Sequence, residues 1–145
     1  MRESKENLWC YWNEPGHLLF VSTNGFVKKN GDAVMGRGCA KEAKQRIRAC
    51  EWFLGQHINE NGNIPTILKL KEGELGILPV KHNWWEEADL ALIRISAKYV
   101  DELAFERGNW ELHIPRLGCG NGKLRWEEVH PLLSYLPDNV IVHSL

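Results

Sequence analysis

The sequence predicts an α/β protein, a three-layer α/β/α sandwich in which helices cover both faces of a mixed sheet. Short apolar runs rich in Leu, Ile and Val alternate with longer segments whose apolar residues recur at helical spacing. Turns rich in Gly, Asn and Pro separate the two kinds of segment. Such alternation is typical of a sheet that lies between helix layers. The 145 residues fit one domain that spans positions 1–145.

Each expected element follows from its local pattern. Apolar runs indicate strands at 8–12, 18–23, 66–70, 75–80, 110–114 and 140–143. Helix-forming residues with one apolar face indicate helices at 41–53, 86–107 and 126–135. The polar residues 1–7 are expected to be a loose lead-in. We expect Gly55 to end the first helix, Pro131 to kink or restart the third, and a turn at 71–74 to form a hairpin.

Charge and cysteine content exclude several classes of protein. The net charge of −1 gives no general basic field for duplex DNA, so a nucleic-acid partner needs a local patch or a pocket. No apolar run of membrane-spanning length and no signal-peptide pattern occurs, so no membrane contact is expected. The four cysteines form no Cys-x-x-Cys pair and are expected to be free thiols of a cytoplasmic protein. Five of the six histidines show no metal-ligand spacing and are expected to be structural or at the surface, namely His17, His57, His113, His130 and His143. The sequence predicts no metal and no cofactor, and a monomer is expected.

Two glycine-rich stretches carry the main functional signal. In 114–129 an apolar strand ends at Pro115, three glycines follow, and a helix is expected from Trp126. In 23–40 a strand end is followed by Gly36-Arg37-Gly38, which leads into the first helix. Glycines let backbone N–H groups approach an anion, and a helix N-terminus adds partial positive charge. Two such helix starts at one sheet edge favour a diphosphate, whereas either loop alone could be a tight turn that needs positive φ.

Neither stretch has the pattern of a common nucleotide-binding loop. No Gly-Lys-Ser or Gly-Lys-Thr follows, as a Walker A loop requires, and no Gly-x-Gly-x-x-Gly follows the first strand. A nucleotide kinase and a Rossmann dehydrogenase are therefore disfavoured. Cys119 lies within the second stretch, where a nucleophile must be weighed against a small residue packed beneath a phosphate.

Together the two stretches resemble the ligand loops of the macrodomain family, whose members bind ADP-ribose. The first, with Asn24 and 34–40, is similar to the loop that carries an asparagine and a Gly-x-Gly helix start. The second, 114–129, is similar to the branch that holds terminal ADP-ribose glycohydrolases and DarG-type antitoxins, which remove ADP-ribose from DNA bases. The resemblance implies a macrodomain-like sandwich whose partner is ADP-ribose or an ADP-ribosylated macromolecule, ADP-ribosylated DNA included. It implies ligand contacts from Thr23, Asn24, Met35, Gly36, Arg37, Gly38, Cys39, Pro115, Leu117, Gly118, Cys119, Gly120, Asn121, Gly122 and Leu124.

In that branch a lysine at a strand end attacks the anomeric carbon of the distal ribose, and Lys81, in a Leu-Pro-Val-Lys run, matches this pattern. The resemblance implies that Lys81 is the nucleophile, that Asn24 positions the ribose and that His82 either relays a proton or faces solvent. A lysine must lose its proton to attack carbon, so its pKa must fall. Burial and the charge of Arg37 or Arg116 would lower it, and a bound diphosphate would raise it. Without the resemblance, Lys81 is a solvated loop lysine or a phosphate contact.

Two departures from the family pattern bear on the function. Gly122 stands where the protein-directed glycohydrolases carry an acidic residue, which favours the antitoxin type, and Asn13-Glu14 occupies the region of the aspartate that accepts from adenine. The predicted function is hydrolysis of the bond between ADP-ribose and a DNA base or protein. The alternatives are a non-enzymatic ADP-ribose reader and an ADP-ribose 1″-phosphate phosphatase. Trp84 could stack on a base. Five other tryptophans are expected to fill gaps in the core or between elements, namely Trp9, Trp12, Trp52, Trp110 and Trp126.

Overall fold

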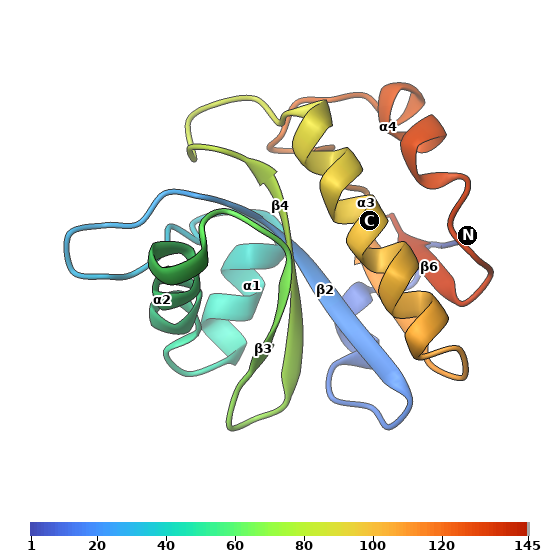
Figure 1. The fold of residues 1–145 in the computed structure, drawn as a ribbon, viewed down its shortest axis with the longest axis horizontal. Helices are drawn as coiled ribbons and strands as arrows, with labels where there is room; N and C mark the ends of the chain where they lie inside the picture. Colours follow the sequence, from blue (N-terminus) through green and yellow to red (C-terminus); the bar gives the residue numbers. More distant parts are fainter. Residues whose placement is uncertain (145) are drawn as a thin grey trace.

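A mixed sheet runs through the middle of the molecule, with helices on both of its faces (Figure 1). The computed structural model describes residues 1–144. Its strands are β1 (Arg2–Ser4), β2 (His17–Asn24), β3 (Thr66–Lys69), β4 (Glu74–Lys81), β5 (Glu111–Pro115) and β6 (Val140–His143). Its helices are the 3-10 helix η1 (Leu8–Tyr11) and the α-helices α1 (Gly38–Arg46), α2 (Cys50–Asn61), α3 (Leu90–Glu106) and α4 (Trp126–Leu133).

The six strands lie in the order β1-β6-β5-β2-β4-β3. Neighbouring strands are parallel, apart from β3 and β4, which form the antiparallel hairpin that the sequence predicts. The sheet is therefore mixed, and the predicted three-layer α/β/α class is confirmed. Within residues 1–144, no helix combines the length and apolar character needed to cross a membrane.

Alternate residues of the central strand β2 enter two separate cores. Leu18 and Phe20 pack with residues of α3 and α4, whereas Leu19 and Val21 pack with residues of α1 and α2. None of these four side chains is more than 1% exposed. Because both faces of the strand are covered, its sequence is a continuous apolar run instead of an alternating one.

The N-terminal segment differs from the prediction. The strand predicted at 8–12 is wrong, because these residues form η1, and the Asn7 side chain caps it by accepting from the Trp9 N–H at 2.9 Å. The loose lead-in predicted at 1–7 is also wrong, because it contains β1, which pairs in parallel with β6. Trp9 is buried with the residues of α1 and α2. A buried single helical turn produces the same short apolar run as a buried strand.

The helix predicted at 41–53 is wrong in its bounds, because the chain forms α1 and α2 instead. Ala49 lies between them with φ 59°, in the left-handed region that interrupts a helix. Gly55 does not end a helix but lies inside α2, where an added Cβ would meet the Gly31 carbonyl oxygen at 1.9 Å. The close approach of a loop therefore requires glycine here. Trp52, predicted to fill a gap in the core or between elements, is 45% exposed.

The later helices start where side chains cap them. The Asp89 carboxylate accepts from the Ala91 N–H at 2.8 Å, so α3 begins after it and not at residue 86 as predicted. α4 begins at the predicted position and ends slightly early, with Pro131 inside it.

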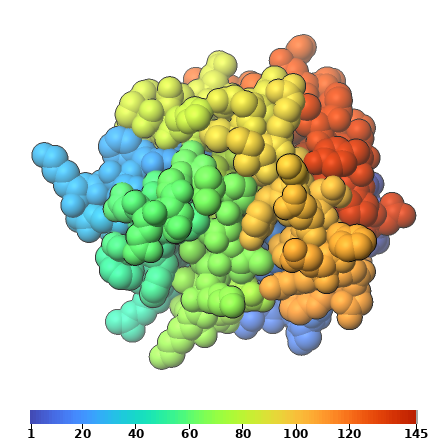
Figure 2. All heavy atoms as spheres, in the orientation of Figure 1, coloured from blue at the N-terminus to red at the C-terminus, as the bar shows by residue number. Residues whose placement is uncertain are grey.

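The carboxyl ends of β2, β4 and β5 lie at one edge of the sheet, because these three strands are parallel. Asn24 is paired with Lys81 in the register of β2 and β4, so the two strands end side by side. The loop 25–37 extends beyond the sheet as the blue loop at the left of Figure 1, and atoms of this colour project from the body of the molecule in Figure 2. Ligands of open α/β sheets bind at this edge.

Candidate functional site

A cleft of about 1070 Å³ lies at the carboxyl edge of the sheet. The segments that follow β2, β4 and β5 form its walls, together with η1 and the end of β6. The predicted site residues that line it are Thr23, Asn24, Met35, Gly36, Arg37, Gly38, Cys39, Lys81, Pro115, Gly118, Cys119, Gly120, Asn121 and Gly122. Three predicted site residues, all within the described chain, do not line it: His82, Leu117 and Leu124.

Leu117 and Leu124 support the walls from behind, whereas the sequence predicts that they contact the ligand. The His82 side chain is 57% exposed, which agrees with the expected alternative that it faces solvent. Leu117 is fully buried with the side chains of α3 and α4, and Leu124 packs against the same core. His82 Nε2 lies 2.7 Å from the Asp89 carboxylate, and the His82 carbonyl oxygen accepts from the Gly25 N–H at 3.1 Å. His82 therefore ties the loop after β4 to the start of α3 and to the loop after β2.

The N-terminus of α1 opens into the cleft. Arg37 is the N-cap residue, and its side chain makes no capping hydrogen bond. No acidic residue lies in the first turn of the helix, so no carboxylate neutralises its partial positive charge. Arg37, Gly38 and Cys39 all line the cleft, which gives the site one open helix start for an anion.

Asn24, at the end of β2, shapes the loop beside that helix start. Its Oδ1 accepts from the Phe26 N–H and its Nδ2 donates to the Val34 carbonyl oxygen, both at 3.0 Å. The two bonds hold the ends of the segment 25–34 close together. An amide group has further bonding capacity, so Asn24 can still contact a ligand in the cleft.

The glycine loop after β5 forms the opposite wall. The Leu124 N–H donates to the Gly118 carbonyl oxygen and the Lys123 N–H to the Gly120 carbonyl oxygen, both at 3.0 Å. Gly118 has φ +74°, and an added Cβ would lie 2.7 Å from Ile93 Cδ1. Glycine is therefore required both for the left-handed backbone and for the close packing of this loop on α3.

The start of α4 is not the second anion site that the sequence predicts. The Arg125 N–H donates to the Glu128 carboxylate at 2.9 Å, and Glu127 and Glu128 both lie in the first turn. These carboxylates neutralise the positive end of the helix, and Arg125 is not among the described residues that line the cleft. The prediction of two helix starts is therefore wrong for α4, and the glycine loop itself forms this wall.

Lys81 lies at the end of β4, between the two walls. Burial, and after it the charges of Arg37 and Lys123, hold the pKa of the Lys81 amino group below its ordinary value. Arg37 has the effect that the sequence predicts. Arg116, the other predicted cation, instead donates to the Glu3 carboxylate at 3.3 Å.

Two exposed tryptophans stand beside Lys81, whose Nζ donates to the Trp84 carbonyl oxygen at 3.3 Å. Trp84 is 51% exposed and Trp85 is 58% exposed, and both line the cleft. Their rings meet edge to face with centroids 5.4 Å apart, and Trp85 meets Phe26 in the same way at 5.5 Å. Phe26 belongs to the loop after β2, so this aromatic group joins two of the loops that form the cleft.

Positive charge is concentrated on the cleft, although the chain has a net charge of −1. Six basic residues line it, namely Lys28, Arg37, Lys44, Lys81, Arg116 and Lys123, against two carboxylates, Glu42 and Glu86. This excess attracts an anionic ligand.

The two cysteines of the cleft are not activated thiols. Burial raises the pKa of Cys39, whose sulfur accepts from the Ser22 N–H at 3.4 Å. Burial also raises the pKa of Cys119. A thiol that stays protonated at neutral pH is a poor nucleophile, which favours a packing role for Cys119.

Several residues that line the cleft were not predicted from the sequence, namely Asn7, Leu8, Trp85, His143 and Ser144. Trp9, which was predicted to have a packing role, also lines the cleft. The N-terminal and C-terminal residues reach the cleft because β1 pairs with β6, which no local pattern shows. Trp85 did have a local signal, since it follows Trp84 directly.

No protein-family model and no curated protein matches the sequence. Solved structures do match. The macrodomain of Mycobacterium tuberculosis DarG has a TM-score of 0.75 and 20% identity, over 99% of this chain and 97% of that chain. The macrodomain of Thermus aquaticus DarG has a TM-score of 0.68 and 20% identity, over 98% of this chain and 95% of that chain.

A third structure, Thermosipho africanus DarTG in complex with ADP-ribose, has a TM-score of 0.64 and 21% identity, over 86% of this chain and 37% of that chain. The first two similarities extend over nearly the whole of both chains. The chain described here therefore has the macrodomain fold.

Proposed function

We propose that this protein binds ADP-ribose in the cleft and hydrolyses the bond between its distal ribose and a modified target. The volume of about 1070 Å³ is enough for a dinucleotide-sized ligand. The diphosphate would lie between the open start of α1 and the glycine loop, where the basic residues offset its charge. One similar structure, Thermosipho africanus DarTG, was solved in complex with ADP-ribose, which supports the same ligand here.

Lys81 carries the catalytic part of the proposal, because this residue lines the cleft and its amine has a lowered pKa. The neutral Nζ attacks C1″ of the distal ribose while the bond from C1″ to the target nitrogen or oxygen breaks. The target leaves with that electron pair and takes up the proton that Nζ loses. Water then cleaves the bond between lysine and ribose, which releases ADP-ribose and restores the amine. Arg37 and the start of α1 offset the charge of the diphosphate during both steps.

A nucleobase is the target that the mouth of the cleft favours. Trp84 and Trp85 expose their rings beside Lys81, where a flat base that leaves C1″ would stack on them. Stacking of this kind contributes about 1–3 kcal/mol per base. The absence of an acidic side chain at Gly122 and the loop resemblance to DarG-type antitoxins support the same target.

A non-enzymatic ADP-ribose reader is the second candidate. Lys81 Nζ is already bonded to the Trp84 carbonyl oxygen. Two carboxylates are among the described residues that line the cleft. One of them, Glu86, already accepts from Asn83 Nδ2 at 2.7 Å. In a reader, Lys81 contacts phosphate and no bond is broken.

Replacement of one lysine separates the two candidates. Lys81→Ala is compared with Lys98→Ala, an exposed lysine on α3, on a single-stranded oligonucleotide with one ADP-ribosylated thymidine. The glycohydrolase proposal expects Lys81→Ala to reduce turnover at least about a hundredfold while free ADP-ribose still binds. It expects Lys98→Ala to keep the wild-type rate.

Equal turnover by Lys81→Ala and the wild type would exclude Lys81 as the nucleophile. A wild-type protein that binds ADP-ribose but releases it from neither DNA nor protein, and leaves ADP-ribose 1″-phosphate intact, is a reader.

A further inference from the structure

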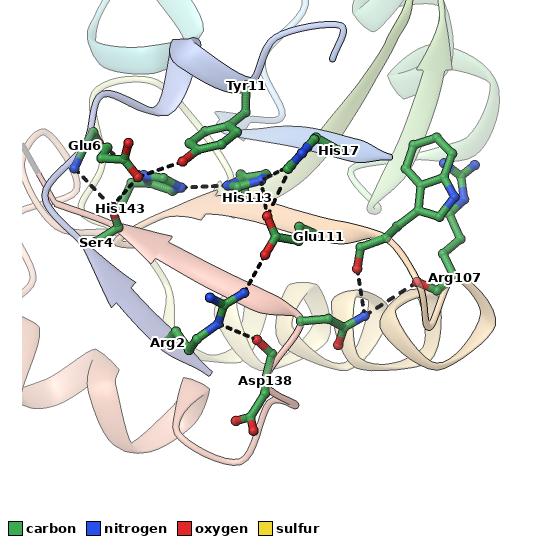
Figure 3. A network of polar contacts seen from close by, with 12 residues as sticks. Arg2, Ser4, Glu6, Tyr11, His17, Arg107, Glu111, His113, Asp138 and His143 are labelled. Carbon is green, nitrogen blue, oxygen red and sulfur yellow. Dashed lines mark hydrogen bonds and ion pairs between the residues drawn. The ribbon is translucent and has the colours of Figure 1, made fainter. Parts of the chain in front are cut away.

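Three histidines form a ladder across the face of the sheet that η1 covers (Figure 3). His17 lies on β2, His113 on β5 and His143 on β6. Tyr11 of η1 stacks on His113 with ring centroids 3.9 Å apart. Sequence spacing does not reveal this histidine ladder, because His17 and His113 are 96 positions apart.

The hydrogen bonds of the histidine ladder determine which ring nitrogen carries each proton. His113 and His143 are buried, and a neutral imidazole has one N–H donor and one lone pair that accepts. The Glu6 carbonyl oxygen can only accept, so His143 Nδ1 donates to it at 3.0 Å. His143 Nε2 therefore accepts from His113 Nδ1 at 2.8 Å. His113 Nε2 keeps a lone pair, which faces His17 Nδ1 at 2.9 Å.

Three metal-binding donor atoms meet at the outer end of the ladder. His17 Nδ1 lies 2.9 Å from His113 Nε2 and 3.3 Å from Glu111 Oε1. His113 Nε2 and Glu111 Oε1 are 4.0 Å apart. In a tetrahedral zinc site the ligand atoms lie about 3.4 Å from one another, because each is about 2.0–2.1 Å from the ion. Small rotations of the two imidazoles and the carboxylate would therefore produce the spacing that an ion needs.

We propose that His17, Glu111 and His113 bind a divalent transition-metal ion of the zinc class. Two imidazoles and one carboxylate favour Zn²⁺, Co²⁺, Ni²⁺ or Cu²⁺, whereas Mg²⁺ and Ca²⁺ prefer oxygen ligands. The ion replaces the proton that His17 Nδ1 shares with His113 Nε2, and a neutral His17 then carries its proton on Nε2. His17 and Glu111 are partly exposed, so water can complete the coordination from the solvent side.

Neighbouring groups already hold the three ligands in place. Arg2 donates to Glu111 Oε2 at 2.6 Å, which leaves Oε1 directed at the two imidazoles, and Arg2 Nε donates to the Asp138 carbonyl oxygen at 2.9 Å. His143 fixes the ring of His113 through the bond to Nδ1. Outer partners of this kind orient metal ligands and select their tautomers.

The proposed ion would also stabilise residues that line the cleft, although it lies outside the cleft. His143, at the inner end of the ladder, lines the cleft, and its bond to the Glu6 carbonyl oxygen reaches the segment that leads into η1. Tyr11, stacked on His113, ends η1, whose Leu8 and Trp9 also line the cleft. Metal binding is therefore expected to stabilise the fold without supplying a group to the reaction.

The test uses the full chain, freed of metal with a chelator and titrated with Co²⁺. We expect one Co²⁺ per chain with visible absorption bands, displaced by an equal amount of Zn²⁺, and a higher melting temperature with Zn²⁺. His17→Gln and Glu111→Gln change partly exposed residues, so these variants should fold, and each is expected to weaken Zn²⁺ binding at least about tenfold.

Two further variants serve as controls. His130→Gln lies on α4, outside the ladder, and is expected to bind Zn²⁺ like the wild type. Cys10→Ser removes an exposed thiol and is also expected to leave binding unchanged. Zn²⁺ binding that persists in a His17→Gln/Glu111→Gln double variant, or that is lost in Cys10→Ser, would overturn the proposal, as would a wild type that binds neither ion.

Discussion

The two helix starts that follow glycine-rich loops look alike in sequence but differ in their electrostatics. α1 begins at Gly38 with an uncapped N-terminus, has no acidic residue in its first turn and faces the cleft. α4 begins at Trp126, and the N–H of its N-cap residue Arg125 already donates to the Glu128 carboxylate. Glu127 is a second acidic residue in the same turn. The start of α1 can therefore bind an anion, whereas the start of α4 already binds the carboxylate of Glu128.

A glycine loop before a helix therefore does not by itself predict an anion site. The residues of the first helical turn decide whether the positive end of the dipole is free. In the proposed site the diphosphate therefore has an asymmetric environment, with a helix start on one side and a glycine loop with Lys123 on the other.

The largest expected effect concerns the loop wall. Gly118→Ala places a Cβ at φ +74° and 2.7 Å from Ile93, and is expected to lower the free energy of unfolding by about 2–4 kcal/mol. Gly36→Ala, in the other loop, meets no atom within 4 Å and is expected to change it by less than about 0.5 kcal/mol. Urea unfolding measures both. Equal stabilities of the two variants would show that the glycine loop is not tightly packed on α3.

The next effect separates the two N-cap residues. Arg37→Gln removes a cation from the open start of α1 and is expected to weaken ADP-ribose binding about tenfold, or about 1.4 kcal/mol. Arg125→Gln, at the N-cap of α4, is expected to change the affinity by less than about twofold, because Arg125 does not line the cleft. Calorimetry on the matched pair gives the answer, and equal losses would restore α4 as an anion site.

A smaller effect tests the cap of α4. Glu128→Ala removes the acceptor for the Arg125 N–H and is expected to lower the free energy of unfolding by about 0.5–1 kcal/mol. Its ADP-ribose affinity is expected to equal that of the wild type. A clear gain in affinity would mean that the carboxylate had been blocking an anion site.

The smallest expected effect is a shift in the pH dependence of the turnover rate. The pKa of Lys81 lies below its ordinary value, so the neutral amine, and with it the turnover rate, is expected to increase as the pH rises toward that pKa. Arg37 is one cause of the lowering. In Arg37→Gln the pKa therefore increases, and the rising part of the profile is expected to move to higher pH. A profile of unchanged position would mean that Lys81 does not limit the rate.

Local sequence patterns predicted the elements that have a strong signal of their own. The run at 18–23 and the hairpin of β3 and β4 appear as expected, because a continuous apolar run indicates a strand buried on both faces and a short turn between two apolar runs indicates a hairpin. The Gly118 loop was also visible, since closely spaced glycines mark a backbone that side chains would block.

The wrong predictions concern features that depend on distant parts of the chain or on a signal that was not used. β1 exists only because it pairs with β6 at the other end of the chain, and that pairing also brings the N-terminal segment to the cleft. Trp52 belongs to a helix-forming stretch, but the break at Ala49 turns the direction of α2, and the side chain is exposed. The cap of α4 was only half visible in sequence, because Glu128 lies three residues after Arg125, the spacing of a capping box, but arginine is not a usual N-cap residue.

Calorimetric titration of the wild-type protein with ADP-ribose decides whether the cleft binds this ligand. We expect saturable binding of one ADP-ribose per chain, weakened in Arg37→Gln and retained in Arg125→Gln. The absence of saturable binding up to about 1 mM ADP-ribose, a free energy weaker than about −4 kcal/mol, would contradict it.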